Sequence, residues 1–141
     1  MSETRNDNEH AISNARGWFE TIKEQVAAFN AAVERDPHNK KFPNEQDECR
    51  EAITAGPLSV QVRGDWYSPG ERVRDDAEPV EYEILLTTGG PALRIIGRLD
   101  SGEPISATLE WQDWGTPWTR AVGIADEATL LSYASHFYFG A

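Results

Sequence analysis

Residues 80–99 read VEYEILLTTGGPALRIIGRL and alternate apolar with polar side chains on both sides of a glycine-rich turn. A period of two residues is typical of a half-buried β-strand. The turn at 87–91, TTGGP, predicts a hairpin, because glycine readily adopts the positive φ angles of tight turns. The stretch therefore predicts antiparallel strands at 80–86 and 92–99, with Glu81 and Glu83 beside Arg94 and Arg98 on the solvent-facing side.

Two further segments share this period. Residues 58–62, LSVQV, precede the hairpin and predict a half-buried strand, and residues 105–111, ISATLEW, follow it. The expected inward face of this last strand consists of Ile105, Ala107, Leu109 and Trp111. Residues 64–79 form a long connection rich in glycine, proline and charge, for which we expect an exposed loop. Together these strands predict a four-stranded antiparallel meander with one solvent-facing side.

Helical periodicity dominates the chain before the sheet. Between Ala11 and Arg35, apolar residues recur at steps of three and four, as in an amphipathic helix that Pro37 ends. Asn44 is expected to cap a second helix that runs to about Ala55, where a Gly-Pro pair follows. The apolar seam of the first helix consists of Ile12, Ala15, Phe19, Ile22, Val26, Phe29 and Val33.

The predicted fold class is α+β, with two N-terminal helices, the four-stranded meander and a C-terminal helix that starts at an Asp126 cap. A chain of 141 residues fits one domain, because two cores of half that size would each be marginal. We expect a single domain over 1–141, with 1–9 flexible, a helical part at 10–56, and the sheet plus C-terminal helix at 57–141.

Composition excludes several classes of function. The 24 acidic and 13 basic residues leave a net charge of -11, which repels nucleic acid and anionic membranes. No apolar stretch approaches the length of a membrane span, and the polar N-terminus does not resemble a secretion signal. The single cysteine, Cys49, cannot form an internal disulfide. We therefore expect a cytoplasmic protein that binds neither membranes nor nucleic acid directly.

Signals for catalysis are weak. His10, His38 and His136 are scattered and show no metal-ligand spacing, so neither a metal nor another cofactor is expected. The glycines of the hairpin lie between two strands, which is not the context of a phosphate-binding loop. An enzyme centred on His136 and Asp113 is the weakest of the hypotheses considered, and the chain is predicted not to be an enzyme.

Two features indicate partner binding. Carboxylates that share a strand face or a helix face lie about 6 to 7 Å apart, close to the spacing of successive phosphates, so an acidic array can occupy a basic nucleic-acid groove. The segment WQDWGTPWT at 111–119 places tryptophans, which are enriched in binding hot spots, where the fourth strand gives way to a loop. The alternative is that this loop packs over the open end of the sheet against the final helix. The candidate partner-binding residues are Glu45, Asp47, Glu48, Glu51, Asp75, Asp76, Glu78, Glu81, Glu83, Trp114 and Trp118.

A second hypothesis concerns the N-terminal helix. Its apolar seam repeats every seven residues for three repeats, which is compatible with a coiled-coil dimer as well as with a core-facing helix. A structural or adaptor protein that oligomerises through this helix, for example as a homodimer, is therefore the alternative function.

The motifs TTGGPALRI at 87–95, QDWGTPWT at 112–119 and YASHFYFG at 133–140 resemble those of a group of small acidic proteins from bacteriophages and mobile elements. The resemblance covers about residues 57–141 and implies no catalytic residues. It implies a phage-type inhibitor of a host defence complex, of the anti-CRISPR or antirestriction kind. Combined with the acidic array, it predicts a non-enzymatic protein that mimics nucleic acid at the basic groove of a host protein.

Overall fold

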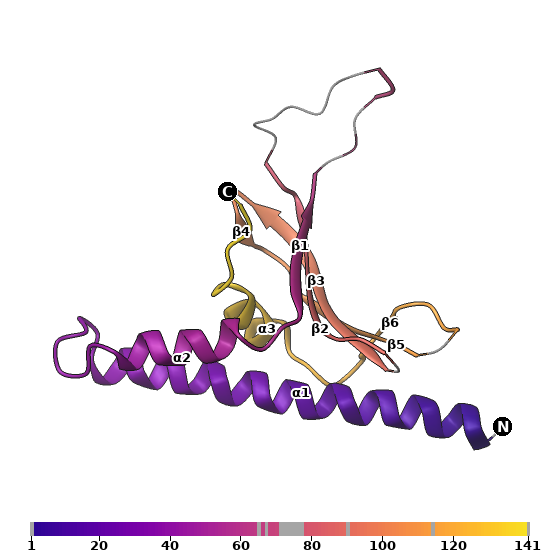
Figure 1. Ribbon diagram of the computed structural model, residues 1–141, viewed down its shortest axis with the longest axis horizontal. Helices are drawn as coiled ribbons and strands as arrows, with labels where there is room; N and C mark the ends of the chain where they lie inside the picture. Colours follow the sequence, from indigo (N-terminus) through magenta and orange to yellow (C-terminus); the bar gives the residue numbers. More distant parts are fainter. Residues whose placement is uncertain are drawn as a thin grey trace.

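The computed structural model describes residues 2–64, 66, 68–70, 78–89, 91–113 and 115–140, with side chains from Glu9 onward. Over these residues the chain forms three helices and six strands in an α+β arrangement (Figure 1). Their order is α1 (Ser2–Arg35), α2 (Glu45–Thr54), β1 (Ser59–Arg63), β2 (Glu81–Thr87), β3 (Ala92–Asp100), β4 (Glu103–Pro104), β5 (Thr108–Gln112), β6 (Thr119–Arg120) and α3 (Glu127–Ala134).

The sheet is antiparallel throughout, as predicted, with strand order β1-β2-β3-β5-β6 and β4 paired with the end of β3. The predicted number of four strands is wrong, because the described residues include β4 and β6 as well. Each of these strands has two residues, which is too short to produce an alternating pattern in the sequence. β4 returns onto β3 through Ser101 and Gly102, both at positive φ.

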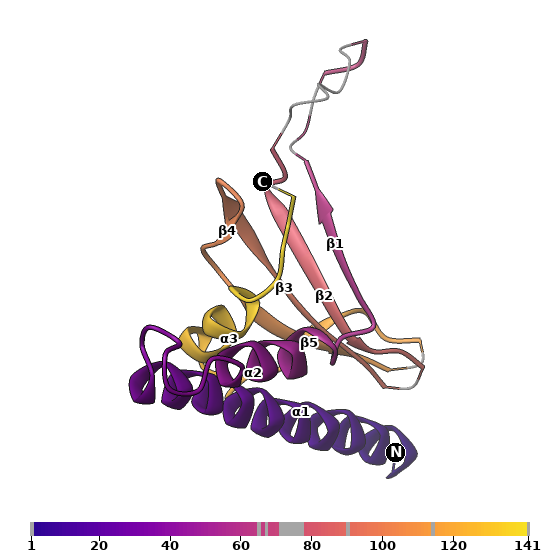
Figure 2. The ribbon, with the colours of Figure 1, turned by 60° about the vertical axis from the view of Figure 1, so that its left-hand side comes forward.

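The helices form a layer on one face of the sheet. Figures 1 and 2 show α1 running along the base of the molecule, with α2 beside its C-terminal half and the sheet standing on this layer. α1 begins at Ser2, well before the expected start near Ala11. The sequence pattern did not predict this first part of the helix, because residues 2–9 are polar and contribute no apolar period. No helix in the described ranges is long and apolar enough to cross a membrane.

The core lies between the helical layer and the sheet. Ile22 of α1, Ile53 of α2 and Tyr133 of α3 are fully buried there against Ile84 and Ile95 of the sheet. Trp111 is buried as predicted, together with Ala107 and Leu109, whereas Ile105 is exposed because it precedes β5. The described residues therefore share one core.

β1 departs from the predicted burial. Its apolar residues and the preceding Leu58 were expected to be half-buried, yet Leu58, Val60 and Val62 are 61%, 37% and 45% exposed. Val60 lies opposite Ile84 and Val62 opposite Tyr82, so both valines share the core-facing side of the sheet. β1 is an edge strand, and Figure 2 shows that the helices do not extend over it, whereas Ile84 and Tyr82 of β2 are buried in the core.

Candidate partner-binding surfaces

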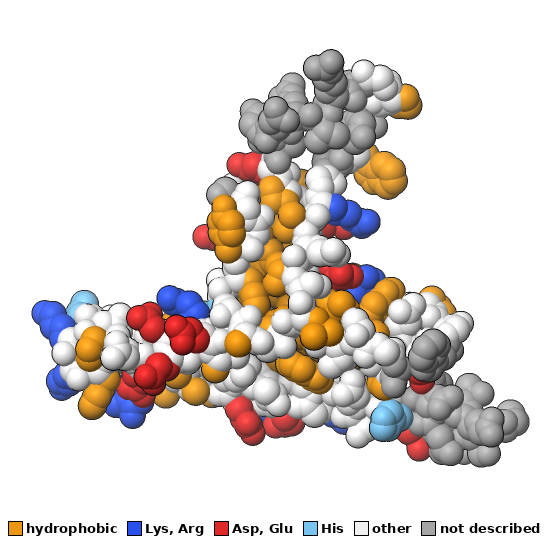
Figure 3. Space-filling model, in the orientation of Figure 1, with side chains coloured by type: hydrophobic (Ala, Val, Ile, Leu, Met, Phe, Trp, Pro, Cys, Tyr) orange, Lys and Arg blue, Asp and Glu red, His pale blue; other side chains and the backbone are white. Residues whose placement is uncertain are grey.

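α2 presents three exposed carboxylates close together on one helix. Asp47, Glu48 and Glu51 are exposed, and none of them forms an ion pair with a described residue. Figure 3 shows carboxylates gathered over this helix. Residues three and four apart on a helix are neighbours about 5 to 6 Å apart at Cβ, so these side chains share a surface. Asp47 and Glu48 also lie in the first turn of the helix, where negative charge interacts favourably with the helix dipole.

Several contacts hold α2 in a fixed position. Ile53 enters the core, and the amide of Gln25 on α1 donates to the Ala52 carbonyl at 3.3 Å. Glu45, predicted as a contact residue, instead forms an ion pair with Arg35 at the end of α1. Asn44 occupies the N-cap position as predicted, although its side chain makes no capping hydrogen bond. The acidic face of α2 is therefore displayed by a rigid element.

Asp36 organises the connection that leads into α2. Its carboxylate is buried and accepts the backbone N–H groups of Lys40, Lys41 and Phe42 at 2.7 to 2.9 Å. These hydrogen bonds, that of Phe42 foremost, lower the pKa of Asp36. The Asp36 carbonyl also accepts the Gln46 amide at 2.8 Å. The sequence shows only a breaker-rich segment here; an aspartate before a proline is the one signal that this residue closes a turn.

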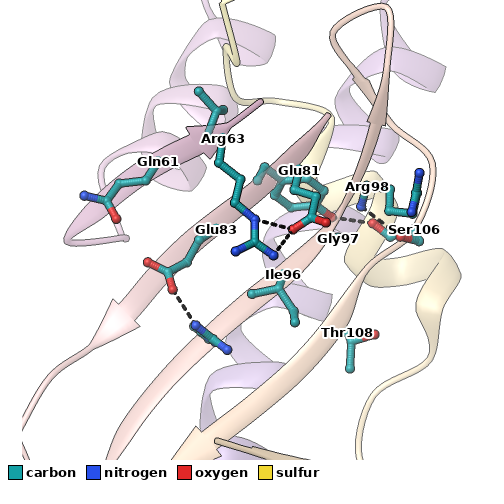
Figure 4. A pocket seen from close by; sticks show the side chains of 12 residues that line it. Gln61, Arg63, Glu81, Glu83, Ile96, Gly97, Arg98, Ser106 and Thr108 are labelled. Atoms are coloured by element: carbon teal, nitrogen blue, oxygen red, sulfur yellow. Dashed lines mark hydrogen bonds and ion pairs between the residues drawn. The ribbon is translucent and has the colours of Figure 1, made fainter. Parts of the chain in front are cut away.

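The predicted strand carboxylates lie on the outer face of the sheet, away from the helices. Glu81 forms an ion pair with Arg63 of β1, and Glu83 pairs with Arg94 of β3 at 2.7 Å (Figure 4). Arg98 is the register partner of Glu81, but the carboxylate bonds to Arg63 instead. The negative charges of Glu81 and Glu83 are thus offset within the sheet, unlike those of Asp47, Glu48 and Glu51 on α2.

Arg94 links three strands on this outer face. Its guanidinium bonds to Glu83 of β2 and to Glu110 of β5, both at 2.7 Å. The Trp118 ring lies against the same group, with its centroid 4.1 Å from Cζ. Trp118 is half-buried, and this contact lies on the outer face of the sheet.

The remaining predicted contact residues are Glu78, Asp75, Asp76 and Trp114. Glu78 is described and exposed. Asp75, Asp76 and Trp114 lie outside the described residues.

The outer face is hollowed into a groove of about 610 Å³. Its walls include Gln61 and Arg63 on β1, Glu83 on β2, and Ile96 and Arg98 on β3 (Figure 4). The lining carboxylates, Glu81 and Glu83, are the two already paired with arginines. The negative charges of the groove are therefore offset by arginines of the same sheet.

His136 and Asp113 belong to different parts of the molecule. His136 follows α3 and packs edge-on against Phe29 of α1, with ring centroids 4.4 Å apart. Burial, together with nearby Arg50, lowers the pKa of His136. Asp113 follows β5, and Figures 1 and 2 place that end of the sheet away from α3. The described residues also contain no group of three or more side chains suited to holding a metal ion.

The apolar seam of α1 faces the chain's own core. Ala15, Phe19, Ile22 and Val26 are all buried against the sheet and α3. A coiled coil would need the same side chains. In this structure these four side chains pack within one chain, while Ile12, Phe29 and Val33 of the same seam are partly buried.

Comparison with protein-family models, with curated proteins and with solved structures finds no match to this chain.

Proposed function

We propose that this protein is a non-enzymatic inhibitor that binds the basic nucleic-acid groove of another protein through the acidic face of α2. The observation that carries the proposal is a contrast between two sets of carboxylates. Asp47, Glu48 and Glu51 are exposed and form no ion pair with a described residue, whereas Glu81 and Glu83 of the sheet are each held by an arginine. A carboxylate already held by arginine gains little from a second cation, whereas an unpaired one retains its full attraction. The net charge of -11 would also speed encounter with a basic partner.

The host context is the part of the proposal that comes from the sequence motifs. Small acidic phage proteins of the kind that this chain resembles include inhibitors of host defence nucleases. A protein that covers the groove of such a nuclease excludes DNA or RNA by competition and needs no catalytic residue. Binding would release the counterions held on both surfaces, so affinity would fall as salt rises.

The test combines charge reversal with competition. The triple variant Asp47→Lys, Glu48→Lys, Glu51→Lys is compared with wild type for capture of proteins from a bacterial lysate, each capture being repeated with excess duplex DNA. We expect the wild-type protein to capture nucleic-acid-binding proteins that excess DNA displaces. We expect the triple variant not to capture them.

A matched control makes the same change in charge elsewhere. Glu9, Asp100 and Glu103 are exposed and lie off α2, so their reversal to lysine adds the same charge to another region. We expect this control to retain capture. Equal loss of capture in both variants would show that net charge alone, and not the face of α2, determines binding. Capture that excess DNA cannot displace would contradict the proposal that the protein occupies a nucleic-acid groove.

A further inference from the structure

β1 is an unprotected edge of the sheet. Among the residues that the structure describes, it ends the strand order and pairs with β2 alone, and Figure 2 shows its outer side clear of the helices. An edge strand presents unpaired backbone N–H and C=O groups, which natural proteins commonly guard with proline, lysine or bulges. The strand SVQVR contains neither proline nor lysine, and its register with β2 runs unbroken from Ser59 to Arg63. The N–H and C=O groups of alternate residues that point away from β2 are therefore available for pairing with another strand.

Apolar side chains accompany this free edge. Leu58, Val60 and Val62 lie exposed beside the buried Tyr82 and Ile84, so the core-facing surface of the sheet continues into solvent at β1. Figure 3 shows apolar side chains continuing up the sheet from the helical layer. An apolar surface that continues a core is the usual mark of an interface.

We propose that β1 pairs antiparallel with β1 of a second copy, so that two sheets join into one across a two-fold axis at Gln61. This register places Val60 opposite Val62 of the second copy, and apolar side chains meet on the core-facing side. On the outer side, Arg63 lies opposite Ser59 of the second copy rather than opposite another arginine. The strand is therefore complementary to itself in both polarity and charge, which a two-fold interface requires.

The charge of β1 also supports pairing with β1 of a second copy. Arg63 is the one charged residue of β1, and Glu81 of its own chain already holds it in an ion pair. A second copy of β1 therefore adds no unpaired charge to the junction. The pairing is independent of the proposed function of α2, and the two are tested by different readouts.

Gln61 provides the decisive test, because it would face itself across the axis. Directly opposed like charges destabilise a strand pair by up to about 1 kcal/mol, so Gln61→Lys and Gln61→Glu should each weaken self-association by up to roughly fivefold. Mixing the two variants places lysine opposite glutamate and should restore association at least to the wild-type level. Sedimentation equilibrium measures each constant, with the dimer at twice 15.8 kDa.

Asn30 is the matched control. It is exposed on α1, away from β1, so Asn30→Lys and Asn30→Glu should leave self-association unchanged. Circular dichroism confirms that each variant is folded. A wild-type chain that remains monomeric up to roughly 1 mM overturns the proposal. So does a dimer that neither Gln61 substitution weakens, or a mixture that associates no better than the separate variants.

Discussion

The hydroxyl of Tyr82 donates a 2.6 Å hydrogen bond to the main-chain carbonyl of Ser106. Tyr82 on β2 lies opposite Gly97 on β3, and its ring reaches past the glycine to the segment between β4 and β5. The same ring packs against Phe139 near the C-terminus, with centroids 4.8 Å apart. One side chain therefore joins two strands, an irregular connection and the C-terminal tail.

This relationship predicts that Gly97 tolerates no side chain. A Cβ at position 97 would lie 1.9 Å from the Ser106 oxygen and 2.7 Å from the Tyr82 ring. Gly97→Ala must displace backbone, and we expect a loss of about 3 kcal/mol in the free energy of unfolding, measured in urea. Gly17→Ala is the control: its Cβ would meet nothing within 4 Å, and it should stabilise α1 by about 1 kcal/mol. Equal stability of Gly97→Ala and wild type would contradict the close approach.

Buried tyrosines predict sensitivity to alkali. Burial raises the pKa of both Tyr82 and Tyr133 above the ordinary value of 10, with Glu127 adding to the effect at Tyr82. Because the unfolded chain releases these protons more readily, their contribution is complete below pH 10 and is lost as the pH rises toward the folded-state pKa. Absorbance at 295 nm should show two phenols that ionise only as the protein unfolds. Tyr82→Phe should remove one of them and the double variant with Tyr133→Phe both; an unchanged late step would contradict the assignment.

The fold class was predictable because apolar periodicity records which side of an element faces the core. The alternation from Val80 to Leu86 placed β2 correctly, and the steps of three and four in α1 identified its buried seam. The same signal failed at β1, since alternation cannot distinguish a covered strand from an edge strand. Val60 and Val62 fit the pattern yet lie at the uncovered margin of the sheet.

The candidate surface was harder to predict because charge neutralisation depends on strand neighbours. Glu48 and Glu83 cannot be distinguished as acidic contact residues from the sequence alone. In the fold, Glu83 forms an ion pair with Arg94, whereas Glu48 forms none with a described residue. Proximity of Glu83 to Arg94 was expected from the hairpin register, whereas the Glu81–Arg63 pair required knowing that β1 adjoins β2. The pairing of Glu81 and Glu83 therefore follows from the strand order.

Asp36 predicts loss of stability in acid. Its three backbone hydrogen bonds, with that of Phe42 the strongest cause, hold its pKa below the ordinary value of 3.8. A lowered pKa contributes stability that is present above pH 3.8 and is lost as the pH falls through the folded-state value. Asp36→Asn should lower stability at pH 7 and flatten its dependence on pH below 4, as followed by urea unfolding across pH. A variant with an unchanged acid profile would show that other groups set it.

Arg94 gives a prediction about the outer face of the sheet. It is 20% exposed and holds Glu83 and Glu110, which are 26% and 17% exposed, so Arg94→Met would leave two largely buried carboxylates without their cation. We expect a loss of about 1 to 3 kcal/mol in unfolding free energy, because stranded charges cost more than the pair contributes. Trp118 would also lose the guanidinium from its ring, which fluorescence can follow.

Neutralising the two carboxylates separates charge from packing. In the triple variant Arg94→Met, Glu83→Gln, Glu110→Gln, no unpaired charge remains, so much of the lost stability should return. Trp118 emission should stay altered, because its contact depends on the guanidinium rather than on the carboxylates. If the triple variant were as unstable as Arg94→Met alone, the arginine would act by filling space between the strands, and the ion pairs would contribute little to the sheet.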